Sequence, residues 1–329
     1  MKIVKLGYYH EAFTNEEINS LFLDIESCFN GMNINDGPMV CHYFPKSALL
    51  SIIKDKKFYF SDSDFLNDYS ESQQFYSIIE KISDTTDKDS AALKIFKEIL
   101  RMKPMITNEI SFSSPGVVLD EDEGFLYNRR NYIFCCSTDD DCLSNWKYYG
   151  KGSGYEAYNI AFNSNRYFAY INENFGFKGC KCFAGRVIYD DEVKMQFIHK
   201  LINRIDNFIS EQEYNKDIIR ALTTRLFYYI MDISLFFKDS AYKDENEFRF
   251  VISLDNSKIK SNTIEYDFRF TNDILIPFLK IPFDKQMIKF VGIGPCMDAE
   301  SSSKSLYALL EYYEYSDTAV AASTIPLRY

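Results

Sequence analysis

The chain has 329 residues, of which 46% are hydrophobic, including 29 Phe and 25 Tyr. This composition supplies a sizeable core and excludes an intrinsically disordered chain. The 37 Lys and Arg residues are outnumbered by 48 Asp and Glu residues, which gives a net charge of −11. Duplex DNA is therefore a poor partner, because basic side chains that neutralise phosphates supply most non-specific affinity for DNA.

The cysteines and the apolar segments predict a cytoplasmic protein. Eight Cys in a long chain without a signal peptide are typical of reduced thiols and not of a disulfide framework. Cys180 and Cys182 lack the two-residue gap of a zinc knuckle, so no metal is expected. The longest apolar-rich stretch, 222–237, carries Arg225 and Asp232 and is shorter than the roughly 20 residues of a membrane span, so we expect a buried helix and no membrane contact.

The N-terminal part, residues 1–38, is predicted to be a helical segment of its own. Thr14 and Glu17 have the spacing of a capping box at the start of a helix over 14–30. Apolar residues at helical spacing follow them.

Residues 39–329 are predicted to form one α+β domain. Strands are expected where apolar residues alternate or run together, and helices where they recur every three or four residues. In chain order, the expected elements are strand 39–44, helix 47–54, strand 56–61, helices 70–82 and 88–102, strand 132–137, helix 141–149, strands 158–163 and 182–190, helices 191–212 and 215–237, strands 245–253, 264–270, 276–282 and 288–295, helix 303–313 and a closing strand within 318–328.

The order of these elements favours a mixed or antiparallel sheet over a doubly wound parallel one, because strands and helices do not alternate strictly. The two long helices between residues 191 and 237 interrupt the strands and are predicted to form an inserted helical lobe. Residues 104–124 are irregular and acidic, and we expect a mobile loop there.

Glu245 and Glu247 are the first candidates for chemistry. If residues 245–253 form a strand, side chains two positions apart point to the same face. Two carboxylates on one face repel each other unless a ligand or an ion pair uses them. Such a pair can stabilise an oxocarbenium-like centre and orient a nucleophile. The alternative is a solvated strand edge, or ion pairs with Lys243 and Arg249.

His42 and a cluster of aromatic residues are further candidates. His42, one of three His residues, could donate a hydrogen bond to a ligand hydroxyl, or it could be a core residue bonded to a backbone carbonyl. Trp146, the only Trp, is followed closely by Tyr148 and Tyr149 and a glycine-containing loop. These rings could stack on a planar ligand, and core packing is the alternative.

The segment 61–71 is rich in acidic and amide side chains. Its composition is similar to that of a calcium loop, but it lacks the EF-hand spacing and glycine. Capping of the following helix is the preferred interpretation, because side-chain oxygens accept hydrogen bonds from free backbone N–H groups there. The alternative is a metal-dependent nuclease that uses Asp62, Asp64, Asp68 and Glu71.

Six segments, taken together and in order, resemble the bacterial family filed as domain of unknown function 2971. They are HYFPKSALLSIIKDKKFYFSDSDFLNDYSE (42–71), YIFCCSTDDDCLSNWKYYG (132–150), YNIAFN (158–163), FKDSAYKDENEFRFVI (237–252), FVGIGP (290–295) and STIPLR (323–328). The layout of this family is similar to the ADP-ribosyltransferase fold, so the resemblance implies that fold here.

The same resemblance implies roles for individual residues. His42 on the first strand would hold a ribose of NAD, and Tyr148 or Tyr149 would stack on nicotinamide. Glu247 on a late strand would contact the ribose under attack, and Glu245 would orient the acceptor. The remaining residues that the resemblance places near NAD are Tyr43, Ser61, Asn67, Trp146 and Arg249.

The expected function is therefore transfer of ADP-ribose from NAD, as substrate, to a protein or nucleic-acid acceptor, as in a toxin or a phage-defence effector. The first alternative is a non-catalytic sensor or interaction module of a bacterial defence system. The metal-dependent nuclease is the second alternative.

Overall fold

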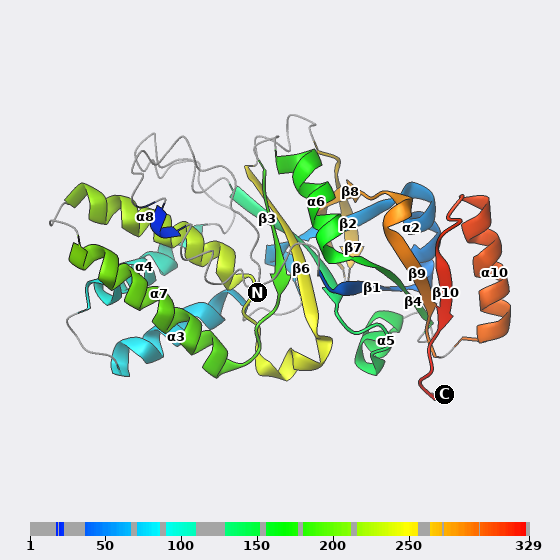
Figure 1. Ribbon diagram of the computed structural model, residues 1–329, viewed down its shortest axis with the longest axis horizontal. Coiled ribbons are helices and arrows are strands. Elements are labelled where there is room, and N and C mark those ends of the chain that lie inside the picture. The colour runs from blue at the N-terminus through cyan, green and yellow to red at the C-terminus, as the bar shows by residue number, and fades with distance from the viewer. Residues whose placement is uncertain are drawn as a thin grey trace. The chain divides into compact units, whose positions relative to one another are not determined.

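A computed structural model describes residues 18, 20–22, 37–66, 71–85, 90–109, 129–151, 156–176, 180–211, 216–255, 264–271, 273–295 and 297–326. Internal contacts divide the chain into two compact units (Figure 1). The first unit holds the described residues of 1–31, 66–129 and 187–242, and the second holds those of 32–65, 130–186 and 243–329. The domain boundaries expected from the sequence stay a prediction.

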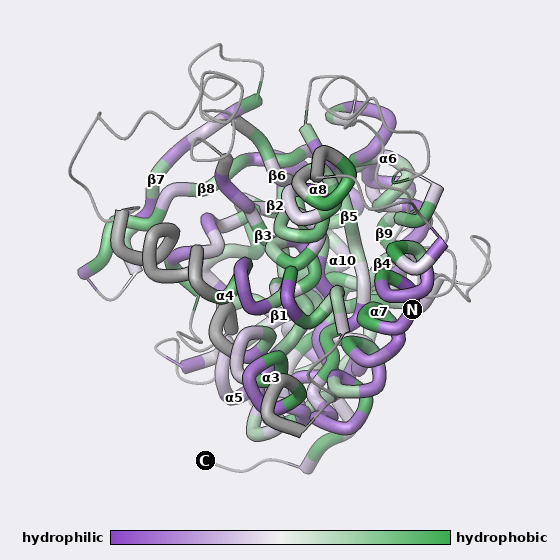
Figure 2. Tube along the Cα trace, turned by 90° about the vertical axis from the view of Figure 1, so that its left-hand side faces the viewer, coloured by the Kyte–Doolittle hydropathy of each residue, from purple (hydrophilic) through white to green (hydrophobic). Residues whose placement is uncertain are grey.

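Long helices make up the described part of the first unit: α3 (Glu71–Thr85), α4 (Ala91–Glu109), α7 (Asp191–Glu211) and α8 (Lys216–Ser234). They pack against one another, and α7 shows the alternation of hydrophobic and hydrophilic residues of an amphipathic helix (Figure 2). The helices expected over 70–82, 88–102, 191–212 and 215–237 are thus confirmed.

Two predictions for this unit need correction or lie outside the described residues. Helix α4 continues to Glu109, so the first part of the segment expected to be an irregular loop over 104–124 is helical. Residues from 110 onward in that segment lie outside the described part. In the N-terminal segment, residues 18 and 20–22 are helical, and Ile18 and Phe22 are buried. The predicted cap at Thr14 is not among the described residues.

The second unit is built on a ten-stranded, mostly antiparallel sheet, which confirms the expected α+β class with a mixed sheet. The strand order is β10-β9-β4-β1-β3-β2-β8-β7, with β6 paired to β3 and β5 paired to β6. Strands β9 and β10 pair in parallel. The strands are β1 (Met39–Pro45), β2 (Lys57–Asp62), β3 (Arg129–Ser137), β4 (Ala157–Asn163), β5 (Lys181–Arg186), β6 (Glu247–Asp255), β7 (Tyr266–Thr271), β8 (Ile274–Pro282), β9 (Ile288–Ile293) and β10 (Ala319–Ala322).

Shorter helices connect these strands. They are α2 (Leu49–Asp55), α5 (Leu143–Gly150), α6 (Ser164–Phe175) and α10 (Ala299–Tyr312), with 3-10 helices η2 (Lys46–Ala48), η3 (Ser63–Phe65) and η6 (Lys285–Met287). A further 3-10 helix, η5 (Ser240–Glu245), leads into β6. Among the described helices, none has the length and apolar character that crossing a membrane requires.

Helix α6 is absent from the elements expected from the sequence. It begins where the Asn163 side chain accepts a hydrogen bond from the backbone N–H of Arg166, a standard N-cap arrangement. It then buries Tyr167, Ile171 and Phe175, which recur every four residues. The sequence therefore contained both the cap and the periodicity of this helix.

Aromatic residues fill one side of the sheet. The rings of Phe58 and Phe134 stack with centroids 4.6 Å apart, and Phe58 also stacks on Phe162 at 5.3 Å. Tyr167 of α6 contacts this cluster edge-on, 5.4 Å from Phe58. Helix α5 covers a different part of the sheet, where Trp146 packs edge-on against Tyr43 at 4.6 Å. Much of the high aromatic content is therefore core.

Some strand bounds differ from the expected ones. Strand β5 ends at Arg186, and only an isolated bridge at Ile188 follows it. Strand β10 lies within the segment 318–328 that was expected to hold a closing strand, and it ends at Ala322. The backbone N–H of Ser323 still donates to the carbonyl of Ile293 at 2.8 Å, whereas Ser323 Oγ and the N–H of Thr324 bond to the side chain of Asp141. Strand β6 begins at Glu247 and not at Glu245, and the reason concerns the site itself.

Candidate functional site

The candidate site lies where β1 and β2 pair with different parts of β3. Strand β1 meets β3 at Cys41↔Ser137, whereas β2 meets it at Ser61↔Ile133 and at the next pair along. Between these positions the carbonyl oxygen of Cys135 accepts a hydrogen bond of 2.9 Å from Nδ1 of His42. The His42 side chain thus forms a hydrogen bond to β3 between the part of β3 that pairs with β1 and the part that pairs with β2.

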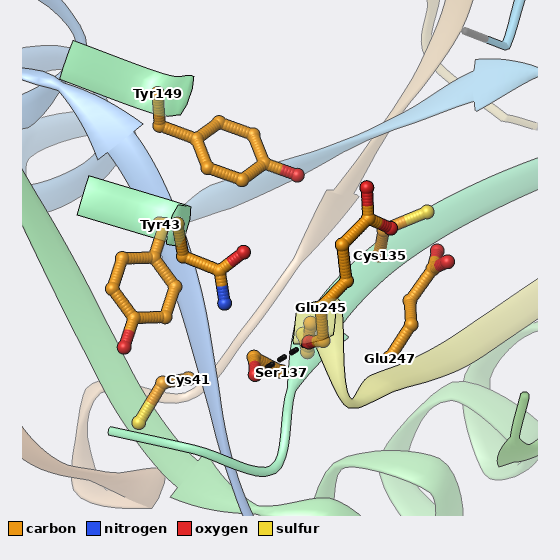
Figure 3. A pocket seen from close by; sticks show the side chains of 9 residues that line it. Cys41, Tyr43, Cys135, Ser137, Tyr149, Glu245 and Glu247 are labelled. Atoms are coloured by element: carbon orange, nitrogen blue, oxygen red, sulfur yellow. Dashed lines mark hydrogen bonds between the residues drawn. The ribbon is translucent and has the colours of Figure 1, made fainter. Parts of the chain in front are cut away.

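A pocket with about 260 Å³ of empty space, partly open to solvent, lies in this unit. Strand β1, strand β3, helix α5 and the η5–β6 junction all contribute to its wall (Figure 3). The lining residues are Cys41, Tyr43, Cys135, Cys136, Ser137, Asn145, Tyr149, Glu245 and Glu247. Four of the residues selected from the sequence, Tyr43, Tyr149, Glu245 and Glu247, therefore come together.

The two glutamates reach the pocket through a bend and not along a continuous strand. Glu245 ends η5, Asn246 has a left-handed φ of 45°, and Glu247 begins β6. The expected strand over 245–253 is wrong at its start for this reason. Asn is among the few residues other than glycine that adopt this conformation at low cost.

Strand β3 holds the bend in place. Ser137 Oγ donates a hydrogen bond of 2.8 Å to the carbonyl of Glu245, and the backbone N–H of Thr138 donates one of 2.8 Å to the carbonyl of Asn246. With the backbone fixed on both sides of Asn246, both carboxylates extend into the same pocket (Figure 3).

Glu247 is bound by Arg249 in a buried ion pair. Nε of Arg249 donates to Oε1 and Nη2 donates to Oε2, each at 2.9 Å. The two side chains are only 6% and 1% exposed, respectively. This is the planar two-point geometry that guanidinium groups form with carboxylates. The ion pair with Arg249, which the sequence analysis gave as one alternative for Glu247, is therefore present.

Tyr43 and Tyr149 form an aromatic part of the wall. Their rings are nearly parallel, with an angle of 20° and centroids 6.3 Å apart. The hydroxyl of Tyr43 donates to the carbonyl of Asp139 at 2.9 Å and accepts from the N–H of Cys142 at 3.1 Å, which fixes the ring. Burial, with the nearby Cys135, Glu247 and Glu245, raises the pKa of Tyr149 well above its ordinary value, so its hydroxyl stays protonated.

Two thiols of the pocket, those of Cys41 and Cys136, are poor nucleophiles. Burial, with Asp140 and Asp139 nearby, raises the pKa of Cys41 to about 12. Burial likewise raises the pKa of Cys136 well above its ordinary value. The thiolate is the reactive form of cysteine, so both side chains act here as small apolar groups. The six described cysteines form no disulfide.

Asn145 is a pocket residue that the sequence interpretation missed. It lies on α5, is only 4% exposed, and its Nδ2 has no hydrogen-bond partner among the described residues. One signal could have found it: Asn145 and Tyr149 are four residues apart, and positions four apart share one face of a helix.

His42 does not line the pocket, because neighbouring residues of a strand point to opposite faces and Cys41 and Tyr43 occupy the pocket side. Its ring packs 4.4 Å from Phe134 and lies 6.5 Å from that of Tyr149. Burial, together with the charge of Arg269, outweighs the bond to Cys135 and lowers the pKa of His42 to about 4.

The hydrogen bond of His42 decides which ring nitrogen carries the proton. A carbonyl oxygen can only accept, so Nδ1 donates to Cys135. In the neutral ring Nε2 is then an acceptor. The sequence interpretation had His42 donating to a ligand hydroxyl, whereas in this tautomer it could only accept from one.

Ser61, Trp146, Tyr148 and Arg249 do not line the pocket either. Ser61 Oγ accepts a hydrogen bond of 2.8 Å from Nη2 of Arg269. Trp146 is buried and donates from Nε1 to Asp141 at 2.8 Å. Tyr148 is 50% exposed on α5. Asn67 lies outside the described residues.

The acidic segment over 61–71 is described only in part. Asp62 is fully buried, forms an ion pair of 2.8 Å with Nη1 of Arg130, and accepts from the N–H of Asp64 at 3.1 Å. Asp68 and the side chain of Glu71 lie outside the described part. Among the described residues, no group of three or more His, Cys, Asp and Glu side chains is arranged to hold a metal ion.

The search of curated proteins and the search of solved structures returned no match to the chain. Residues 145–250 match a family model described as "Protein of unknown function (DUF2971)". The matched segment begins at Asn145 on α5 and ends in β6, so it includes Tyr149, Glu245 and Glu247 of the pocket. The match covers less than half of the chain, and it supports a similarity of this segment to the DUF2971 family.

Proposed function

We propose that the pocket binds the nicotinamide-ribose end of NAD and that the chain transfers ADP-ribose from NAD to a macromolecule. The observation that supports this most directly is the convergence of Glu245 and Glu247 beside the ring of Tyr149 in one pocket. Carboxylates suit a sugar centre that becomes positively charged, and an aromatic face suits a planar leaving group.

The proposal assigns the nicotinamide ring and the adjoining ribose to the pocket, which is partly open to solvent, and leaves the rest of the dinucleotide outside it.

The proposed reaction breaks the bond between ribose C1′ and the ring nitrogen of nicotinamide. The bonding electron pair leaves with the ring, which becomes neutral, and positive charge develops on the ribose. An acceptor oxygen or nitrogen then bonds to C1′ and gives up its proton. Glu247, directed by Arg249, would stabilise the charged ribose. Glu245, which is less buried, would orient the acceptor and take its proton.

The expected role of His42 in holding a ribose stays a prediction and has no part in this proposal. His42 points to the face of β1 opposite Cys41 and Tyr43, which line the pocket.

The test uses purified full-length chain, labelled NAD and a cell extract. Wild type is compared with Glu245→Gln, Glu247→Gln and the control Glu300→Gln, which alters an exposed glutamate on α10. We expect label on a macromolecule, or released nicotinamide, with wild type and control. Each pocket variant should lower the rate about a hundredfold or more. Trp146 fluorescence reports whether the variants are folded. Wild-type rates in both pocket variants would overturn the assignment.

The Glu247–Arg249 pair also favours a second candidate, a non-catalytic binding module. Both carboxylate oxygens of Glu247 bond to Arg249, and this reduces the negative potential that Glu247 can offer to a cationic ribose. If wild-type protein binds NAD in a calorimeter but leaves it unchanged in every extract, the binding module becomes the better assignment.

A further inference from the structure

The side-chain amide of Asn145 is a buried donor that faces the pocket without a partner in the described part of the protein. The residue is 4% exposed and lines the pocket, and no described residue forms a hydrogen bond with its Nδ2. Buried polar groups are nearly always hydrogen-bonded, and those that are not commonly mark a functional role or the binding of a water, an ion or a ligand. An unpaired donor at a pocket wall indicates that a ligand acceptor completes it.

The rest of the wall limits which acceptor this can be. Glu245 and Glu247 are carboxylates, so a negatively charged ligand group would be repelled. A neutral carbonyl oxygen would not be repelled. If that carbonyl belongs to a carboxamide, its NH₂ group can donate to a carboxylate while its oxygen accepts from Asn145. Tyr149 lies one helical turn from Asn145 and offers an aromatic face for a ring that carries the carboxamide.

We propose that Asn145 is the specificity-determining residue of this pocket and that its Nδ2 recognises the carbonyl oxygen of a neutral carboxamide on a six-membered aromatic ring. This inference rests on the proposed function for the location of the ring, and it names the group that the pocket selects. The carboxamide binds, and the corresponding acid, which differs only in carrying a carboxylate, is rejected. The same recognition would select the amide form of the dinucleotide over its acid form.

Calorimetric titration of the full chain with three small probes tests this inference without any turnover. The probes are nicotinamide, nicotinic acid, which carries the carboxylate, and 3-methylpyridine, which has the ring without a carbonyl. Wild type should bind nicotinamide about tenfold more tightly than either of the others. Asn145→Ala should weaken nicotinamide binding about fivefold and leave 3-methylpyridine unchanged, because only the first ligand loses a hydrogen bond.

Two further variants sharpen the test. Asn145→Asp keeps the shape of the side chain and replaces the donor by an acceptor, so it should lower nicotinamide affinity more than Asn145→Ala does. Asn174→Ala removes an exposed amide on α6 that bonds to the carbonyl of Tyr170, and it should bind all three probes as wild type does.

The outcomes separate this inference from the proposed function. Equal wild-type affinity for the three probes, no binding of nicotinamide, or unchanged nicotinamide affinity in Asn145→Ala would each overturn the role of Asn145. Selective binding that depends on Asn145, in a protein that never converts NAD, would support the inference and count against the transferase. If the protein converts NAD but its selectivity among the probes does not depend on Asn145, the transferase would be supported and the role of Asn145 would be overturned.

Discussion

Arg249 binds both carboxylate oxygens of Glu247 at 2.9 Å, two residues away on the same strand, and both side chains are buried. The strand geometry allows this, because residues two apart point to the same face. The pair fixes the direction of the Glu247 carboxylate at the pocket.

Removal of Arg249 should be costly. Arg249→Met leaves Glu247 as a buried charge without this partner, and breaking such a pair typically costs about 3–5 kcal/mol. Chemical unfolding followed by Trp146 fluorescence measures the loss in this unit. The control Arg166→Met, at an exposed position on α6, should change stability by less than about 0.5 kcal/mol. The double variant Glu247→Met with Arg249→Met should regain most of the loss, and a double variant as unstable as the single one would contradict this account.

His42 should make stability fall on mild acidification. Its pKa is about 4 in the folded protein against an ordinary 6.5, so the unfolded chain binds a proton that the folded chain does not. The free energy of unfolding therefore does not depend on His42 titration above about pH 6.5. It falls by about 2 to 3 kcal/mol as the pH is lowered from 6.5 towards 4.

Calorimetric unfolding across this pH range compares wild type with His42→Gln and with His199→Gln, a control on the exposed side of α7. The His42 variant should lose this part of the pH dependence, whatever its stability at neutral pH. The His199 variant should keep it. A pH profile for His42→Gln that is parallel to that of wild type would show that His42 does not titrate as described.

The side chain of Asp141 connects the C-terminal segment to α5, and its replacement should lower stability. Its carboxylate accepts hydrogen bonds from Trp146 Nε1 at 2.8 Å, from Ser323 Oγ at 2.5 Å and from the N–H of Thr324 at 2.9 Å. Asp141→Asn weakens these charge-assisted bonds and should cost roughly 1–3 kcal/mol. Asp317→Asn, an exposed change in the same unit, should have little effect in the same unfolding experiment.

The Asp141 variant should also differ in its response to acid. Burial opposes ionisation, but the hydrogen bonds from Ser323, Thr324 and Trp146 outweigh it and lower the pKa of Asp141 below its ordinary 3.8. This contribution is present above pH 3.8 and is lost as the pH falls through the lower folded value. Asp141→Asn should therefore lose less stability than wild type on acidification below about pH 4.

Gly294 in the GIGP segment should tolerate no side chain. A Cβ there would lie 2.8 Å from the carbonyl oxygen of Ala157 and 3.1 Å from Cε3 of Trp146. Gly294→Ala should cost about 1–3 kcal/mol and shift the fluorescence of Trp146, because a backbone atom and a packed ring must move. Gly176→Ala is the control, since its new Cβ would meet only the side chain of Asn172. Equal stability of the two variants would count against this packing.

Local pattern in the sequence was enough to predict most elements of this protein. Apolar periodicity placed the long helices α7 and α8 and the strands β1 and β3 close to their observed bounds. Periodicity works because a helix or strand buries one face or both, whatever it packs against. The same pattern identified Glu245 and Glu247 as an unusual pair, although not the bend between them.

The tertiary structure alone decided which of the selected residues meet. The pocket joins Tyr43, Tyr149 and Glu247, which are brought together by pairing of β1, β3 and β6 and by the packing of α5. His42, adjacent to Tyr43 in sequence, bonds to Cys135 and stays out of the pocket lining. Strand pairing links residues far apart in the chain, and strand alternation separates neighbours, so spacing along the sequence could predict neither the pocket nor the unpaired amide of Asn145.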